Sequence, residues 1–264
     1  MILVLTILLL AAIAVMMMML AWLTVLRTGN SGWADTVWSA TVGMVGVTAA
    51  LVALGPGEPT PRALIVAAVV AAWSIRLATH IGRRTLAGAD DPRYAQLRKE
   101  WGEAAYPRQL LLFLQIQAAA AFILGLAVLA AAHNPAPLGL GDALGALIAV
   151  VALVGEAVAD RQLRQFKANP ANKGSVCNTG LWSLSRHPNY FFEWLFWLAL
   201  VPVALGYGWG LVALAAPAMM YGLLAHISGV PPLEAHMLRS RGEAYRRYQQ
   251  RVRAFWPIPR SVST

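Results

Sequence analysis

The stretch Gly180-Leu-Trp-Ser-Leu-Ser-Arg-His-Pro-Asn-Tyr-Phe-Phe-Glu193 joins a group of polar side chains to an apolar run that continues to residue 206. Ionisable groups are costly inside a lipid bilayer, so polar residues at the mouth of an apolar segment are typically functional. The apolar run that follows is long enough to cross the hydrocarbon core of a bilayer. The stretch therefore predicts a membrane-spanning helix that begins at a functional site.

The composition of the whole chain is also that of a membrane protein. Of its 264 residues, 58% are hydrophobic and 12% are charged, whereas soluble domains carry about 25% charged residues. The net charge of +9 reflects 21 Lys and Arg against 12 Asp and Glu. Basic residues collect in the cytoplasmic loops of membrane proteins, so this charge does not indicate a nucleic-acid partner. The single cysteine, Cys177, excludes an intramolecular disulfide and a cysteine-based metal site.

Apolar runs long enough to span a bilayer divide the chain. They cover residues 2–26, 34–55, 62–81, 110–132, 141–160, 188–206 and 209–228. We therefore expect an all-α, polytopic fold of seven transmembrane helices in one membrane-embedded domain. Residues 229–264 are expected to form a helical cytoplasmic tail. Because no basic residue precedes the first apolar run, we expect that run to be retained as a span and not cleaved.

The basic residues between the spans predict how the chain is oriented. Lys and Arg are frequent in the loops 82–109 and 161–187 and in the tail. The other loops, near residues 56–61, 133–140 and 207, contain none. With seven spans, all the basic loops lie on one side of the membrane if the N-terminus is outside. Since basic loops face the cytoplasm, we expect the C-terminus and the polar site there.

A stripe of ionisable residues ends the fifth apolar run. The 3.6-residue helical period places Glu156, Asp160, Arg164 and Lys167 on one face. A ladder of ion pairs within the helix would explain this spacing. Because Glu156 lies within the apolar run, where an idle carboxylate is costly, we favour a ligand site. Its acids would bind hydroxyl groups and its bases would bind phosphates.

The opening stretch supplies a second candidate site at the start of the sixth run. Pro188 fits the first turn of a helix, where its missing N–H has no consequence. Arg186 and His187 then lie at a helix N-terminus, which favours an anion. Asn189 and Glu193 are four residues apart and share a face. The alternative is ordinary capping with side chains that extend to the membrane surface.

The second and third runs carry a third group of polar residues. Asp35 lies near the start of the second run with Trp33 and Trp38, and few cations are close to it in the sequence. Arg76 and His80 are one helical turn apart in the third run. Charges at these depths should face the interior of the bundle. For Arg76 and His80, extension to the membrane surface is the alternative.

Two other patterns do not predict a site. Residues 139–145 resemble a dinucleotide-binding glycine loop, but they follow a membrane span and not a β-strand, so we expect no Rossmann domain. His226, Glu234 and His236 lack the spacing of a zinc motif, so we expect no metal. Donation to a bound ligand is the favoured role for these side chains.

Together these motifs resemble the steroid 5-alpha-reductase family, over nearly the whole chain. The matching residues are Gly180-Leu-Trp, Ser185-Arg-His-Pro-Asn-Tyr190 and Glu193; Asp160, Gln162 and Lys167; Asp91-Pro-Arg-Tyr94 with Trp101-Gly102; and Gly229-Val-Pro-Pro-Leu-Glu234 with Tyr245 and Tyr248. The resemblance implies a bacterial enzyme of the inner membrane that binds NADPH in a cytoplasm-facing pocket. It also implies hydride transfer to the β-carbon of an enone lipid such as a 3-oxo-delta-4 steroid. We expect a monomer that takes this apolar substrate from the membrane lipid and binds no nucleic acid.

The resemblance further implies roles for single residues. The expected cofactor-binding residues are Glu156, Asp160, Arg164, Lys167, Lys173, Leu181, Trp182, Ser185, Arg186, His187, Asn189, Tyr190, Glu193, Glu234, His236, Arg239, Tyr245 and Tyr248. Asp35 corresponds to the family's catalytic carboxylate, while its catalytic tyrosine has no evident match, so His80 with Arg76 is our substitute. Trp33 and Trp38 are expected to line the substrate pocket. A protonated or hydrogen-bonding Asp35 in an apolar pocket would polarise the substrate carbonyl as enolate charge develops.

Two alternatives from other classes remain open. An isoprenylcysteine carboxyl methyltransferase-like enzyme would share the helical hairpin, the Arg-His-Pro-x-Tyr motif and the Glu and Tyr residues of the tail, but it would use S-adenosylmethionine. The abundance of cations favours the multiply charged NADPH. A transporter or lipid-binding protein would instead show broken helices near the middle of the membrane. The polar groups here are expected at its cytoplasmic edge.

Overall fold

The protein is all-α. The computed structural model describes residues 1–55, 57–88 and 91–258, and over these ranges it is helical and has no β-strand. The chain divides into two compact units. The first consists of Met1–Asp142 with Val203–Ala215, and the second of Ala143–Pro202 with Ala216–Thr264. The predicted all-α class is confirmed, whereas the expected single domain stays a prediction.

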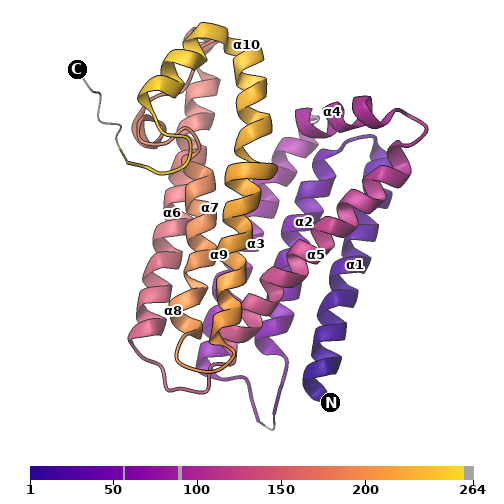
Figure 1. Cartoon of the computed structure of the whole chain (residues 1–264), viewed down its shortest axis with the longest axis vertical. Coiled ribbons are helices and arrows are strands. Elements are labelled where there is room, and N and C mark those ends of the chain that lie inside the picture. Colours follow the sequence, from indigo (N-terminus) through magenta and orange to yellow (C-terminus); the bar gives the residue numbers. More distant parts are fainter. Residues whose placement is uncertain (56, 89–90, 259–264) are drawn as a thin grey trace. The chain divides into compact units, whose positions relative to one another are not determined.

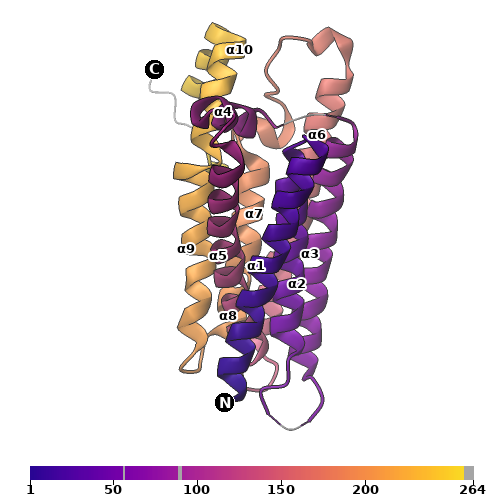
Figure 2. The same ribbon diagram turned by 90° about the vertical axis from the view of Figure 1, so that its right-hand side faces the viewer.

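The first unit is a bundle built around one central helix. Its helices are α1 (Ile2–Thr28), α2 (Gly32–Leu51), α3 (Pro61–Leu86), α4 (Pro92–Trp101), α5 (Tyr106–Ala132) and the short η3 (Gly210–Leu214). In both Figure 1 and Figure 2, α1, α2, α3 and α5 run side by side, and α2 packs against the other three. The short α4 lies across the end of this bundle (Figure 1). It was expected as part of a loop, and it carries residues of the candidate site described below.

Small residues allow the helices of this bundle to approach closely. A Cβ atom at Gly43 of α2 would lie 2.0 Å from the Ser74 hydroxyl oxygen of α3. A Cβ atom at Gly125 of α5 would lie 2.4 Å from Val45 Cγ1 of α2. In membranes, where lipid is as apolar as a leucine side chain, such close packing is a main source of helix association.

Arg62 holds together the end of the first unit that lies away from α4. Its guanidinium is buried and binds both carboxylate oxygens of Asp142, with Nε 2.6 Å from Oδ1 and Nη2 2.9 Å from Oδ2. The remaining donors bind the backbone carbonyls of Asn134, Ala136 and Pro137. One side chain therefore fixes the start of α3, the loop after α5 and the first turn of the next helix.

The second unit contains the C-terminal helices and a long loop. Its elements are α6 (Leu140–Ala168), η1 (Pro170–Asn172), η2 (Gly180–Ser183), α7 (Pro188–Leu198), α8 (Leu200–Ala204), α9 (Ala215–Tyr221), the π-helical η4 (Gly222–Ile227) and α10 (Val230–Arg251). Gly242 has φ 51° and ψ −126°, outside the helical region, so α10 bends there. The expected helical tail is thus largely α10. Its last residues, 259–264, lie outside the described residues.

Six helical segments among the described residues are long and apolar enough to cross a membrane. They are Ile2–Thr28, Gly32–Leu51, Pro61–Leu86, Tyr106–Ala132, Leu140–Ala168 and Gly210–Arg251. The expected span 188–206 is divided between α7 and α8, and neither reaches this length. An integral membrane protein is therefore supported, whereas the seventh span and the orientation of the termini stay predictions.

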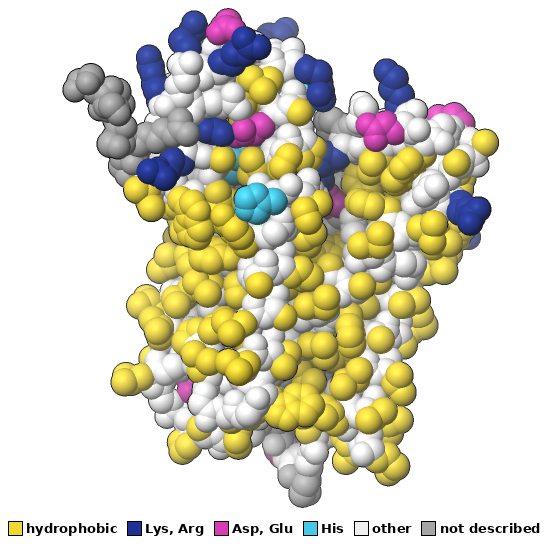
Figure 3. Space-filling view, in the orientation of Figure 1, with side chains coloured by type: hydrophobic (Ala, Val, Ile, Leu, Met, Phe, Trp, Pro, Cys, Tyr) yellow, Lys and Arg dark blue, Asp and Glu magenta, His cyan; other side chains and the backbone are white. Residues whose placement is uncertain are grey.

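The surface is consistent with contact to lipid. On the face seen in Figure 3, hydrophobic side chains cover the flanks of the helices, and Lys and Arg gather around the upper part of α10. Leu8 of α1 and Leu147 of α6 are 59% and 61% exposed. Soluble proteins rarely leave such continuous apolar faces uncovered.

Candidate functional site

Within each unit, a set of polar and ionisable side chains is joined by hydrogen bonds. The Asp35 group, in the first unit, consists of Asp35, Asp91, Arg93, Tyr94 and Gln117. The Glu234 group, in the second unit, consists of Arg186, His187, Glu234, Tyr245 and Gln249. Each is described within its own unit.

The Asp35 group is assembled from three helices. Tyr94 of α4 donates its hydroxyl proton to Asp35 Oδ1 of α2 over 2.9 Å. Arg93 Nη2, also from α4, donates to the other oxygen, Oδ2. Gln117 of α5 donates from Nε2 to the Tyr94 oxygen over 3.0 Å. The carboxylate of Asp35 thus binds a guanidinium on one oxygen and a phenol on the other.

Asp91 fixes the position of Arg93. The Asp91 side chain caps α4 by accepting from the Arg93 backbone N–H at 3.0 Å. Its two oxygens also accept from Arg93 Nε and Nη2, both at 2.9 Å, and Oδ2 accepts from Arg84 at 3.2 Å. Burial disfavours the Asp91 carboxylate, but the bonds and charge of Arg93 outweigh it and hold the pKa of Asp91 below its usual range. Arg93 is therefore held from both sides by carboxylates.

Few cations are near Asp35 in the sequence, but α4 folds back over α2 and brings Arg93 into contact with it. The expected catalytic role of Asp35, as a protonated or hydrogen-bonding group, stays a prediction. The proton of the group resides on Tyr94, because burial, assisted by the charge of Asp35, raises the pKa of the Tyr94 phenol well above its ordinary value.

Tyr94 is the residue that the sequence did not assign to the site. Its motif, Asp91-Pro-Arg-Tyr94, was evident, but its partner Asp35 lies 59 residues earlier in the chain. The fold thus supplies a tyrosine beside the carboxylate where His80 was our substitute. His80 and Arg76 are half-buried on α3, and their assignment stays a prediction. Trp38 lies beside the group, since its indole N–H donates to the Gln117 backbone carbonyl at 3.1 Å.

In the second unit, Glu234 of α10 is the centre of a dense set of hydrogen bonds. Its Oε1 accepts from Arg186 Nε at 2.6 Å, from His187 Nε2 at 3.2 Å and from the Tyr245 hydroxyl at 3.3 Å. Its Oε2 accepts from Gln249 at 2.8 Å. The motif that opens α7 is therefore tied to α10.

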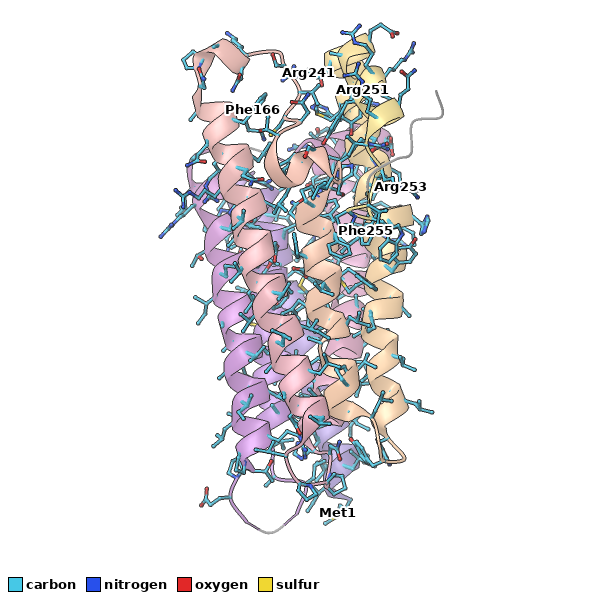
Figure 4. All side chains as sticks on the ribbon, turned by 90° about the vertical axis from the view of Figure 1, so that its left-hand side faces the viewer. Met1, Phe166, Arg241, Arg251, Arg253 and Phe255 are labelled. Atoms are coloured by element: carbon cyan, nitrogen blue, oxygen red, sulfur yellow. The ribbon has the colours of Figure 1, made fainter. Side chains whose placement is uncertain are left out.

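Arg186 and Ser185 also bind the segment that follows α10. Arg186 Nη1 donates to the carbonyls of Gln249 and Val252, and its backbone N–H donates to the Arg253 carbonyl at 2.9 Å. The Ser185 hydroxyl lies 3.1 Å and 2.9 Å from the next two carbonyls. Figure 4 shows Arg253 on this segment, after Arg251 of α10.

We expected Arg186 and His187 to attract an anionic ligand, which stays a prediction; in this structure both contact Glu234. Arg186 is buried and uses its guanidinium on Glu234 and on backbone carbonyls. Burial lowers the pKa of His187 despite the opposing effect of Glu234, so this ring is neutral at physiological pH. It stacks on Tyr190 with ring centres 5.6 Å apart. The Arg-His-Pro motif thus holds α10 and the segment after it in place through hydrogen bonds.

The four ionisable residues predicted to share one face of α6 differ in how deeply they are buried. Glu156 and Asp160 are buried, whereas Arg164 and Lys167 are exposed. The loop before α7 packs on this helix, because the Trp182 indole donates to the Ala159 carbonyl at 3.0 Å. Leu181 N–H similarly donates to Gln162, and the Tyr248 hydroxyl donates to the Trp182 carbonyl. The acids therefore face the interior of the unit and the bases face outward.

The other predicted residues of this unit differ in exposure. Glu193 is buried and accepts from the Trp197 indole at 3.0 Å, and Asn189 is half-buried. The exposed ones are Lys173, His236 and Arg239. Arg241, which the sequence did not single out, is half-buried on α10 (Figure 4), and its Nε has no hydrogen-bond partner among the described residues. No group of three or more His, Cys, Asp or Glu in this described part could hold a metal ion.

Comparison with known proteins gives two findings. Over 68 residues the chain is 46% identical to the probable O-methyltransferase ustE of Ustilaginoidea virens, a match that covers 25% of this chain and 24% of that protein. The chain therefore matches about a quarter of the length of this relative. No solved structure matches. Residues 21–252, which include both polar groups, match a family described as a protein of unknown function, DUF1295, and the chain thus belongs to this steroid 5-alpha-reductase-like family.

Proposed function

We propose that this protein is an NADPH-dependent reductase of the carbon–carbon double bond of an enone lipid, such as a 3-oxo-delta-4 steroid. The observation that most supports it is the Tyr94 phenol held 2.9 Å from Asp35. Reduction of an enone places negative charge on the carbonyl oxygen, and a proton-bearing group there lowers the barrier. Membership in the DUF1295 family supports an enzyme of this kind.

Three side chains would share the chemistry at the carbonyl. Tyr94 carries the only proton between itself and Asp35, and rotation about its C–O bond would turn that proton to the carbonyl oxygen. Arg93 stays bonded to Asp35 and offsets the charge of its carboxylate. Gln117 continues to donate to the Tyr94 oxygen, which stabilises the charge that develops on it.

NADPH, when bound, would supply the hydride. The residues of the second unit fit a multiply anionic cofactor, since Arg164, Lys167 and Lys173 are exposed cations. The orphaned Nε of Arg241 is a further donor suited to a phosphate oxygen. Arg186 of the expected set bonds Glu234 and a backbone carbonyl in this structure.

The proposal includes the membrane setting. The enzyme would cross the inner membrane of a bacterium seven times, with its N-terminus outside and its cofactor site toward the cytoplasm. The basic tail and loops support this orientation. An apolar substrate would reach the site from the lipid.

The test is consumption of NADPH by detergent-purified protein, with and without progesterone, followed by mass analysis of the steroid. Steroid-dependent oxidation with a gain of two hydrogen atoms in the product is the expected result. Protein that binds no NADPH and oxidises none would contradict the proposal.

A second candidate is an S-adenosylmethionine-dependent methyltransferase of the isoprenylcysteine carboxyl methyltransferase type. The observation that favours it is the similarity to a probable O-methyltransferase. Equilibrium binding of each cofactor separates the two candidates. Saturable binding of S-adenosylmethionine without binding of NADPH would replace the reductase with the methyltransferase.

A further inference from the structure

The hydrogen bonds of Tyr94 fix the orientation of the Gln117 amide. A phenol has one proton, and the Tyr94 hydroxyl donates it in the hydrogen bond to Asp35 Oδ1, while the other oxygen of Asp35 accepts from Arg93. The Tyr94 oxygen must therefore accept from Gln117. Only the amide nitrogen can donate, so Nε2 faces Tyr94 at 3.0 Å and Oε1 faces away from it.

The carbonyl half of this amide makes no hydrogen bond to the part of the chain that the structure describes. Gln117 Oε1 is buried and has no hydrogen-bond partner among the described residues. A buried carbonyl oxygen left without a donor loses its hydrogen bonds to water and gains none in return. Nearly all buried polar groups of native proteins are hydrogen-bonded, so an exception beside a reactive group suggests a ligand.

The position of this oxygen restricts what the ligand can be. The oxygen and nitrogen of the amide share one carbon atom, and the nitrogen is already on Tyr94. A donor that reaches Oε1 therefore lies a few bonds from any carbonyl that receives the Tyr94 proton. A hydroxyl group on the carbon next to the carbonyl satisfies this condition, and an unsubstituted ketone does not.

We infer that Gln117 is a specificity-determining residue whose side-chain carbonyl accepts a hydrogen bond from a hydroxyl group next to the reacting carbonyl of the substrate. The inference rests on the proposed function and narrows its substrate class to hydroxylated enone lipids. Sites built to bond a substrate hydroxyl discriminate strongly against analogues that lack it, because their own polar group is then left unpaired.

The experiment measures binding of a matched pair of probes, testosterone and 2-hydroxytestosterone, to the detergent-purified full-length chain without NADPH. Wild-type protein should bind the hydroxylated probe about 10-fold or more tightly than its parent. Gln117→Met, which keeps the length but removes the amide, should reduce this ratio to about one.

Gln115→Met is the matched control. It removes another glutamine amide of α5, one that lies about 200° around the helix from Gln117. This variant should keep the wild-type ratio. The wild-type comparison needs no variant, so the test holds even if Gln117→Met fails to fold.

Two results would overturn the inference. One is a wild-type protein that binds the hydroxylated probe no more tightly than the parent steroid. This would be seen if a water molecule bonds Oε1, or if neither probe binds. The other is a preference that survives in Gln117→Met. Failure of the proposed function looks different, since the binding preference would be intact while neither steroid supports NADPH oxidation.

Discussion

At the scale of single residues, the chemistry depends on which group holds the proton. Asp35 accepts hydrogen bonds from Arg93 and Tyr94, and burial raises the pKa of the Tyr94 phenol, so this phenol keeps its proton at physiological pH. A site with a defined proton position needs no rearrangement of charge before reaction. This makes Tyr94, and not Asp35, the expected donor to the carbonyl.

Replacing Tyr94 tests this assignment. Tyr94→Phe should lower kcat for the reduction of progesterone by about 10²–10³-fold with little change in KM, because the donor acts mainly in the transition state. Steady-state NADPH oxidation measures both constants. Tyr207→Phe is the control, since that tyrosine bonds the Ala130 carbonyl elsewhere in the same unit and its loss should not alter kcat. Equal effects of the two variants would contradict the assignment.

The ion pair of Asp91 makes a prediction about pH. A carboxyl group whose pKa is depressed by folding stabilises the protein above its unfolded pKa, about 3.9 for Asp, and that stability is lost as the pH falls through the folded pKa. The melting temperature of the wild type should therefore fall below about pH 4, and Asp91→Asn should show a smaller fall. Glu103→Gln removes an exposed carboxylate bonded to Arg98, and a similar reduction there would count against a special role for Asp91.

What could be predicted from the sequence at this scale was the identity of reactive residues, not their partners. The Arg186-His187 motif was evident in the sequence, and we expected an anionic ligand to bind it. In the structure the carboxylate that binds Arg186 belongs to Glu234, which lies 48 residues later in the chain and reaches Arg186 only through the fold. Tyr94 was missed for the same reason, because Asp35 and Tyr94 meet only when α4 turns over α2.

At the scale of elements, Arg62 shows how one residue joins three segments. Arg62→Gln removes the cation and leaves Asp142 unpaired, which should cost about 3–5 kcal/mol of stability. Thermal melting in detergent measures this loss. Arg84→Gln removes an ion pair in which the Arg84 side chain is 51% exposed, so it should cost less than about 1 kcal/mol. Comparable losses in the two variants would show that Arg62 does not hold the segments together.

The contact between α2 and α5 depends on a glycine. Gly125→Ala would place a methyl group 2.4 Å from Val45 Cγ1, and the resulting overpacking should cost about 1–3 kcal/mol. Combining it with Val45→Ala moves that volume from one helix to the other and should recover most of the loss. Melting temperatures of the two single variants and the double variant form a cycle. Strictly additive losses would show that the two residues do not pack on each other.

Element boundaries were predictable where a helix ends with its apolar run and wrong where a helix continues into polar sequence. The apolar run 62–81 marks only part of α3, which extends to Leu86 through Arg83 and Arg84. Backbone hydrogen bonding continues into polar sequence, whereas hydropathy responds to the lipid-facing part alone. The polar α4 gave no hydropathy signal, although Asp91 and Pro92 are a typical helix start.

At the scale of the whole molecule, the number of membrane crossings decides where the basic tail lies. Residues 188–204 extend about 25 Å at about 1.5 Å per helical residue, close to the hydrocarbon thickness of about 30 Å. The interruption at Ala199 divides this run between α7 and α8 but does not shorten it. If the run crosses, the tail with its seven arginines lies in the cytoplasm, in agreement with the positive-inside rule. If it does not cross, the tail lies outside and the rule is broken.

Cysteine labelling distinguishes these two topologies. In a Cys177→Ser background the protein has no other cysteine, so Gly208→Cys and Arg247→Cys each introduce a single reactive site, both at exposed positions. With seven spans, a membrane-impermeant maleimide added to intact cells should label Gly208→Cys and should label Arg247→Cys only after the membrane is permeabilised. The reverse pattern would remove α7 and α8 from the set of spans. It would also place the Glu234 group outside the cytoplasm, where NADPH is absent, so the same experiment bears on the proposed reductase.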